Sequence, residues 1–165
     1  MSQKFKQALQ QRMKRLQEAK GKVAKVGIVG HQHYADKNQT PVAYVAAIHE
    51  YGSPSNHIPA RPFMRPTVAA QKKNWANIGK QLLQNGASVE DMLELVGKRA
   101  AGDVFETISN IHSPPLARST KMARNRKAHK QAAKYGKKPN AVSIKPLEDT
   151  KLLISSIGYK VVDKG

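Results

Sequence analysis

Positive charge dominates this sequence and constrains the surroundings in which the folded chain is stable. The 165 residues contain 29 lysines and arginines but only 11 aspartates and glutamates, which gives a formal net charge of +18 at pH 7. Repulsion of this size is tolerated most easily beside a polyanion or an acidic protein surface. The excess is concentrated in residues 1–22, with seven basic groups, and in residues 114–145, with ten basic groups and no acid. Both segments are therefore candidates for contact with an anionic partner.

Composition allows one modest, mostly aliphatic core. Hydrophobic residues make up 39% of the chain and aromatic residues 5%, and a chain of this length suits a single domain. The chain has no cysteine, which excludes disulfides, thiol nucleophiles and thiolate metal sites. Its longest apolar run, at residues 42–48, is far shorter than the about 20 residues that span a bilayer. We therefore expect a soluble protein with no membrane contact, which needs no oxidising compartment.

Hydrophobic periodicity predicts an α+β fold, in which a small antiparallel sheet packs against two or three longer helices. Residues 23–30 and 155–163 alternate between apolar and other side chains as the two strands should. Longer helices are predicted over residues 67–83 and 89–110, and a short apolar helix over residues 42–50.

An amphipathic helix is predicted for residues 3–20, because apolar side chains recur there at steps of four, four and three. This stripe consists of Phe5, Leu9, Met13 and Leu16. We expect the helix to pack on the domain through the stripe; the alternative is that it docks on a neighbouring subunit. We therefore divide the chain into a basic helical segment, residues 1–22, and a single domain, residues 23–165.

Local signals predict where several helices begin and end. Thr40 is a suitable N-cap for the short apolar helix, and Gly52 is its expected C-terminal break. Ser88, with Asp91 three residues later, resembles a capping box at the start of the longest helix. Thr150 is a further predicted N-cap near the C-terminus.

Residues 114–145 show no hydrophobic periodicity, so we predict a long basic loop, a flexible insertion in the domain. Such a polycation can contact phosphates without reading a base sequence, but it lacks the interleaved aromatic residues on which single-strand binders stack bases. Three interpretations stay open: a solvated segment, contact with an acidic protein and contact with DNA. The candidate contact residues are Arg118, Lys121, Arg124, Arg126, Lys127, Lys130, Lys134, Lys137 and Lys138.

No group of residues supports catalysis, so we expect a protein that is not an enzyme and needs no metal or other cofactor. His31 and His33 form a His-x-His pair, and His49 with Glu50 could add a ligand and a base. His49 and Glu50 are adjacent on a predicted helix, however, so their side chains diverge by about 100°. We favour solvated or hydrogen-bonded histidines, and keep a histidine-dependent metal hydrolase as a rival hypothesis.

Five sequence elements follow one another in an order that resembles a family of tailed-bacteriophage proteins. The first block is Val26-Gly27-Ile28, Glu50-Tyr51-Gly52 and Pro59-Ala60-Arg61-Pro62-Phe63. The second is Ser113-Pro114-Pro115-Leu116 with a basic run, then Pro146-Leu147-Glu148-Asp149-Thr150 before Ser156-Ile157. Over residues 23–162 the chain is similar to the tail-completion proteins, also described as neck, minor tail or virion morphogenesis proteins. Lys151 stands where that family usually has glycine.

The resemblance implies a structural protein of the virion head–tail junction, made in the host cytoplasm and assembled as a ring, most simply a hexamer. This ring would complete the tail or join it to the capsid, with other neck and tail proteins as partners and non-specific contact with packaged DNA as a further option. The alternative is a basic DNA-binding accessory protein that acts through residues 114–145. The motif residues carried over are Glu50, Gly52, Pro59, Arg61, Pro62 and Phe63. We expect Phe63 in the core and Arg61 paired with Glu50.

Overall fold

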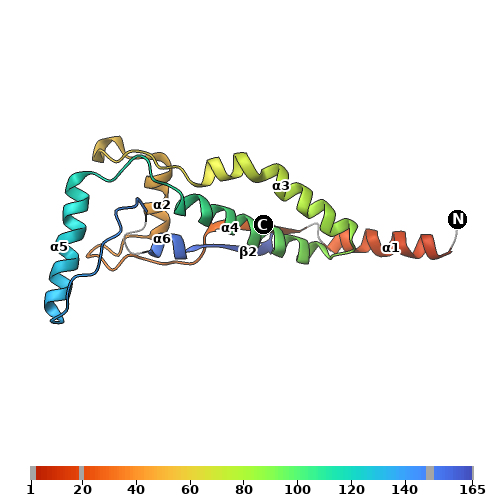
Figure 1. Ribbon diagram of the computed structural model, residues 1–165. Coiled ribbons are helices and arrows are strands. Elements are labelled where there is room, and N and C mark those ends of the chain that lie inside the picture. The colour runs from red at the N-terminus through yellow and green to blue at the C-terminus, as the bar shows by residue number, and fades with distance from the viewer. Residues whose placement is uncertain (1–2, 19–20, 148–150, 165) are drawn as a thin grey trace.

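The computed structural model describes residues 3–18, 21–147 and 151–164, and it confirms the predicted α+β class. The molecule is elongated, with α1 extending from one end and α5 standing across the other (Figure 1). In chain order the elements are α1 (Gln3–Glu18), β1 (Lys22–Ile28), α2 (Val42–Tyr51), the 3₁₀ turn η1 (Pro54–Asn56), α3 (Met64–Gln84), α4 (Val89–Ser109), α5 (Arg118–Lys134), α6 (Leu152–Ser155) and β2 (Ile157–Asp163).

The two strands pair in the antiparallel direction, from Lys22 opposite Asp163 to Ile28 opposite Ile157. α4 packs on this pair and α3 packs on α4, so the centre of the molecule is sheet, helix and helix in sequence (Figure 1). Gly97 of α4 permits the close contact with the sheet. A Cβ atom at this position would lie 2.8 Å from the ring of Tyr159, so glycine is required by packing rather than by its backbone angles.

The hydrophobic core lies where α2, α4 and α6 meet, at the end of the sheet away from α1 (Figure 1). Phe63 is 2% exposed, which confirms its predicted place in the core. The cluster of buried residues is Val42, Ala46, Phe63, Val104, Ile108, Leu147, Leu153 and Ile154.

Two of the predicted helix boundaries are confirmed and one is wrong. Ser88 Oγ accepts a hydrogen bond from the backbone N–H of Asp91 at 3.0 Å, as a capping box requires, and Gly52 ends α2 with φ 78°. Thr40 does not cap α2, because its N–H and hydroxyl both bond to the carboxylate of Asp36. The predicted cap at Thr150 lies outside the described residues.

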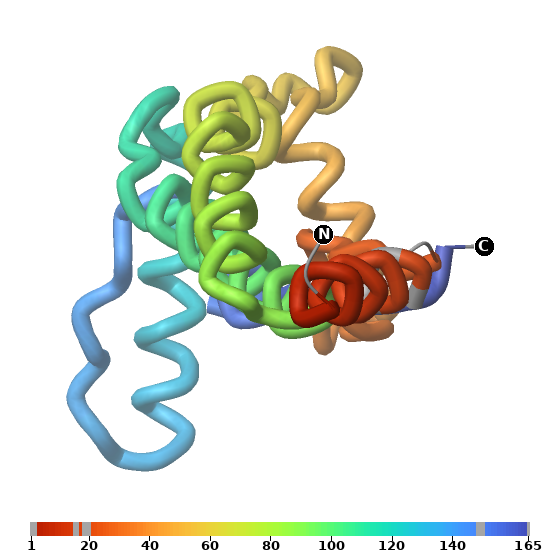
Figure 2. Tube along the Cα trace, turned by 90° about the vertical axis from the view of Figure 1, so that its right-hand side faces the viewer, coloured from red at the N-terminus to blue at the C-terminus, as the bar shows by residue number. Residues whose placement is uncertain are grey.

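The prediction of a loop throughout residues 114–145 is wrong, because residues 118–134 form α5. Alanine, lysine, arginine and glutamine are strong helix formers, and they fill most of this segment. None of the residues in α5 is buried, so the helix carries no apolar stripe and gave no periodic signal. The segment that follows runs back beside α5, and the two project together from the body (Figure 2).

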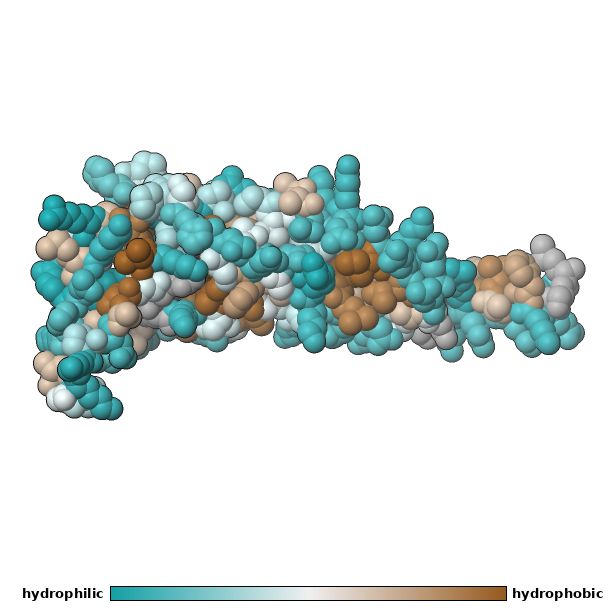
Figure 3. Space-filling model, in the orientation of Figure 1, coloured by the Kyte–Doolittle hydropathy of each residue, from teal (hydrophilic) through white to brown (hydrophobic). Residues whose placement is uncertain are grey.

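The expectation that α1 packs on the domain is also wrong. Phe5, Leu9 and Met13 are each about half exposed, at 54%, 48% and 54%. The side chain of Leu16, the fourth residue of the predicted stripe, lies outside what the structure describes. The space-filling view shows an apolar patch on α1 at the narrow end of the molecule (Figure 3). No helix among the described residues has the length and hydropathy needed to cross a membrane.

Candidate interaction surfaces

Glu50 joins the end of α2 to the start of α3. Its side chain is almost fully buried, and its carboxylate accepts hydrogen bonds from the backbone N–H groups of Phe63, Met64 and Arg65 at 2.8, 2.9 and 3.0 Å. A carboxylate at this place satisfies N–H groups that have no partner within the helix and interacts favourably with its dipole. Burial raises the pKa of Glu50, but these hydrogen bonds outweigh burial, so the pKa lies below its usual value.

The basic partner of Glu50 is Arg65 and not Arg61, which corrects the predicted ion pair. Arg65 Nε lies 3.0 Å from Glu50 Oε1, and its guanidinium also donates to the backbone oxygen of Glu50. Arg61 points the other way, where Nε donates to the carbonyl of Pro114 at 2.8 Å and Nη2 to that of Pro115 at 3.0 Å. Arg61 therefore fixes the start of the basic segment against the proline-rich loop.

The remaining motif residues shape the same junction. A Cβ atom at Gly52 would lie 2.9 Å from the backbone nitrogen of Ala60, so the turn accepts only glycine without displacement of the chain. Pro59 and Pro62 are exposed on this loop, and Phe63 is buried below it. The six motif residues therefore form one local structure that sets the path from α2 to α3.

The basic candidates form an exposed surface on α5 and just after it. Arg126, Lys130 and Lys134 are spaced four residues apart, so they lie on one face of the helix, with Lys127 beside them. Eight of the nine candidates are exposed; Arg124 is half-buried and donates from Nη1 to the carbonyls of Ser143 and Lys145 at 2.8 and 3.0 Å. The exposed candidates are Arg118, Lys121, Arg126, Lys127, Lys130, Lys134, Lys137 and Lys138.

A shallow apolar groove runs along the side of α3 and α4, with Arg12 of α1 at its edge. It has a volume of about 560 Å³. Gly79 keeps α3 close to α4 here, because a Cβ atom would lie 3.2 Å from the sulfur of Met92. Its other lining residues include Trp75, Leu83 and Val96.

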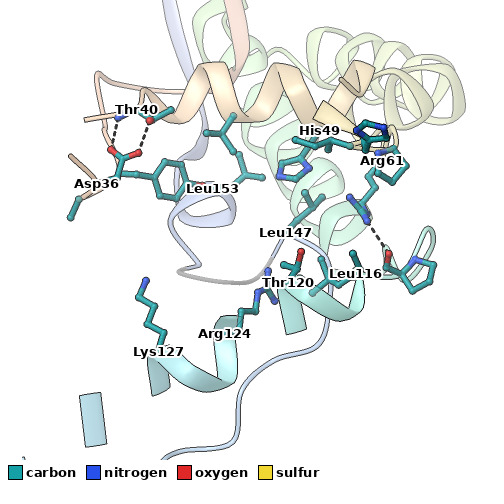
Figure 4. A pocket seen from close by; sticks show the side chains of 18 residues that line it. Asp36, Thr40, His49, Arg61, Leu116, Thr120, Arg124, Lys127, Leu147 and Leu153 are labelled. Carbon is teal, nitrogen blue, oxygen red and sulfur yellow. Dashed lines mark hydrogen bonds between the residues drawn. The ribbon is translucent and has the colours of Figure 1, made fainter. Parts of the chain in front are cut away.

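A larger cavity, of about 700 Å³, lies between α2, the loops on either side of it and the first half of α5 (Figure 4). His49 and Arg61 line one wall, and Arg124 and Lys127 reach it from α5. Burial first, and then the nearby cations Arg61 and Arg124, together lower the pKa of His49 to about 4. Sequence spacing gave no sign of this cavity, because its walls come from segments far apart in the chain.

The histidines do not gather into a metal site. His31 and His33 are exposed on the loop before α2. The carboxylate of Glu50 is engaged at the start of α3, so it is not placed beside His49 as a base. Among the described residues, no group of three or more histidine, aspartate or glutamate side chains could hold a metal ion.

Comparison of the chain with family models, curated proteins and solved structures found no match in any of the three.

Proposed function

We propose that this protein is a non-catalytic structural component of a tailed-phage virion, which assembles as a ring at the head–tail junction. The observation that carries the proposal is the exposed apolar stripe of α1, formed by Phe5, Leu9 and Met13. When a partner covers such a stripe on a projecting helix, association is favoured by about 25 cal/mol for each Å² of apolar surface removed from water. The motif resemblance points to the head–tail junction of a virion, and the exposed stripe offers a surface through which copies can associate.

A ring needs a contact between different surfaces of successive copies, repeated until the rotation closes. The projecting α1 suits such a contact, because one copy can extend it onto the body of the next. The basic face of α5 is then the surface for an acidic neck or tail partner, because its cations are exposed and no acid lies within residues 114–145.

The native mass of the purified chain at about 150 mM salt tests the ring. We expect a closed oligomer of about six copies, the number that six-fold tail tubes imply. Replacement of Leu9 and Met13 by glutamine removes the stripe and is expected to give monomers. The matched control replaces Gln7 and Gln11, on the opposite side of α1, by alanine and is expected to leave the oligomer intact. A chain that is monomeric at every concentration tested contradicts the ring.

A second candidate function is non-specific DNA binding through α5, favoured by the single exposed face of Arg126, Lys130 and Lys134. Each phosphate contact contributes about −0.9 to the slope of log affinity against log salt on duplex DNA. Replacement of these three residues by glutamine should therefore flatten the slope by about 3 if α5 lies on the DNA backbone. Tight, salt-steep binding by a monomer would favour this function over the ring, and weak binding by a ring would favour the first proposal.

A further inference from the structure

The cavity beside α2 combines apolar walls with a few polar groups, as small-molecule sites do. Its volume of about 700 Å³ lies within the range of about 300–1,000 Å³ that is typical of such sites. The apolar part of the lining includes Val45, Ile58, Leu116, Leu147 and Leu153.

Three of the four described charged side chains that line the cavity are cationic: Arg61, Arg124 and Lys127. His49 and Arg61 approach its interior from one side, and Arg124 and Lys127 approach from α5 on the other (Figure 4). The one acidic residue among the described lining residues is Asp36. Its carboxylate lies at the far end of the cavity, where it accepts hydrogen bonds from the N–H and hydroxyl of Thr40 at 2.8 and 2.5 Å.

Arg61 is the buried charge at this site. It is 5% exposed, and its described hydrogen bonds go to two neutral carbonyl oxygens, those of Pro114 and Pro115. These bonds use two of the five N–H groups that a guanidinium carries. A buried cation is costly unless it is paired, and a guanidinium matches the geometry of a carboxylate especially well.

His49 adds a second polar group, one whose Nδ1 atom is buried and has no hydrogen-bond partner among the described residues. Buried polar atoms normally have a partner, so one that lines a cavity beside a buried guanidinium points to a ligand that supplies that partner.

We propose that this cavity binds a small organic acid, with its carboxylate held by Arg61 and His49 and its apolar body against Leu147 and Leu153. Arg124 and Lys127 add positive potential on the opposite wall. The site is independent of the ring proposed above, because none of its lining residues belongs to α1.

Calorimetric titration of the full chain with octanoate and with octanol tests the site, because the two probes share an apolar tail and differ in charge. One charge-assisted hydrogen bond corresponds to about a tenfold change in affinity or more, so octanoate should bind at least tenfold more tightly than octanol. The ring-proton resonances of His49 should shift more with octanoate than with octanol at the same fraction of sites filled. Equal affinity for the two probes, or no binding of octanoate at millimolar concentration, would overturn the proposal.

Variants separate this site from the general positive charge of the protein. His49→Phe keeps a ring of similar size and removes the polar atom, and it should weaken octanoate binding at least fivefold without affecting octanol. Should that variant fail to fold, Lys127→Gln at the exposed rim should weaken octanoate binding two- to threefold. Lys130→Gln, on the exposed face of the same helix, is the matched control and should change neither the octanoate affinity nor the octanol affinity.

Two results with these variants would count against the site. An equal loss of octanoate affinity in Lys130→Gln and in the cavity variants would show diffuse charge attraction and overturn the proposal. An octanoate affinity that is unchanged in both His49→Phe and Lys127→Gln would show that octanoate binds elsewhere on the protein, with the same consequence.

Discussion

The carboxylate of Glu50 accepts hydrogen bonds from three consecutive backbone N–H groups and also pairs with Arg65. Glu50→Gln keeps the shape of the side chain but removes the charge and places an N–H₂ group among N–H donors. We expect the free energy of unfolding to fall by about 2–3 kcal/mol, because buried donors lose a charged acceptor. Urea denaturation measures the change. Glu106→Gln, at an exposed position of α4, is the control and should change stability by less than about 0.5 kcal/mol.

His49 makes the stability of the folded chain sensitive to mild acid. Burial, together with Arg61 and Arg124, lowers its pKa from the ordinary value of 6.5 to about 4. As the pH falls below 6.5 the unfolded chain binds a proton at His49, but the folded chain does so only near pH 4, so folding weakens across this interval. With allowance for partial exposure of the ring, the loss is about 2 kcal/mol.

His49→Phe should remove this part of the pH dependence while leaving the rest. Urea midpoints at pH 7, 5.5 and 4.5 for the two chains give the difference directly. Glu50 contributes a separate loss in both chains, because its pKa is below 4.5 and its stabilisation disappears as the pH falls through that lower value. Parallel pH profiles for the wild type and His49→Phe would contradict a buried, neutral His49.

At the scale of elements, the predictable parts are those that bury a periodic stripe. β1, β2 and α4 pack on one another, so their apolar residues recur at the period of each element. This periodicity predicted the ends of the three elements to within two residues. α5 buries none of its residues, and its helical state follows mainly from intrinsic propensity, which periodicity does not register.

In the candidate site, too, some features were predictable from the sequence and others were not. Phe63 and Gly52 were predictable because a large aromatic residue after proline and a glycine after a helix each have one ordinary role. The partner of Glu50 was not predictable, because Arg61 and Arg65 lie only four residues apart. Only the direction of the chain between them decides which arginine faces Glu50. The cavity depends on contacts between distant segments, which spacing along the chain does not reveal.

Removal of α1 tests whether this helix stabilises the domain or serves only for association. A chain that starts at residue 21 should keep its melting temperature within about 2 °C of the full chain, because the stripe of α1 is exposed and its loss uncovers little apolar surface. The same truncation should abolish the oligomer. A fall of more than about 8 °C, measured on monomers of both chains, would show that α1 packs on the body in solution.

At the scale of the whole molecule, the net charge of +18 is distributed over an elongated shape with basic segments on both projecting arms (Figure 1). Elongation separates like charges, and the described acidic residues of α4 lie in the central body between the arms. Self-repulsion nevertheless remains, and it extends over about 30 Å at 10 mM salt but only about 8 Å at 150 mM. Stability should therefore depend strongly on ionic strength.

We expect the melting temperature of the monomeric protein, truncated before residue 21, to rise by several degrees between about 10 and 150 mM sodium chloride. Arg126→Glu, Lys130→Glu and Lys134→Glu together lower the net charge by six and should reduce this rise, because the exposed face of α5 then no longer repels the rest of the chain. The matched control replaces the same residues by glutamine and should give half that reduction, since it removes half as much charge. A melting temperature that is independent of salt in all three chains would mean that the arms lie too far from the body for their charge to oppose folding, and that their cations act only on partners.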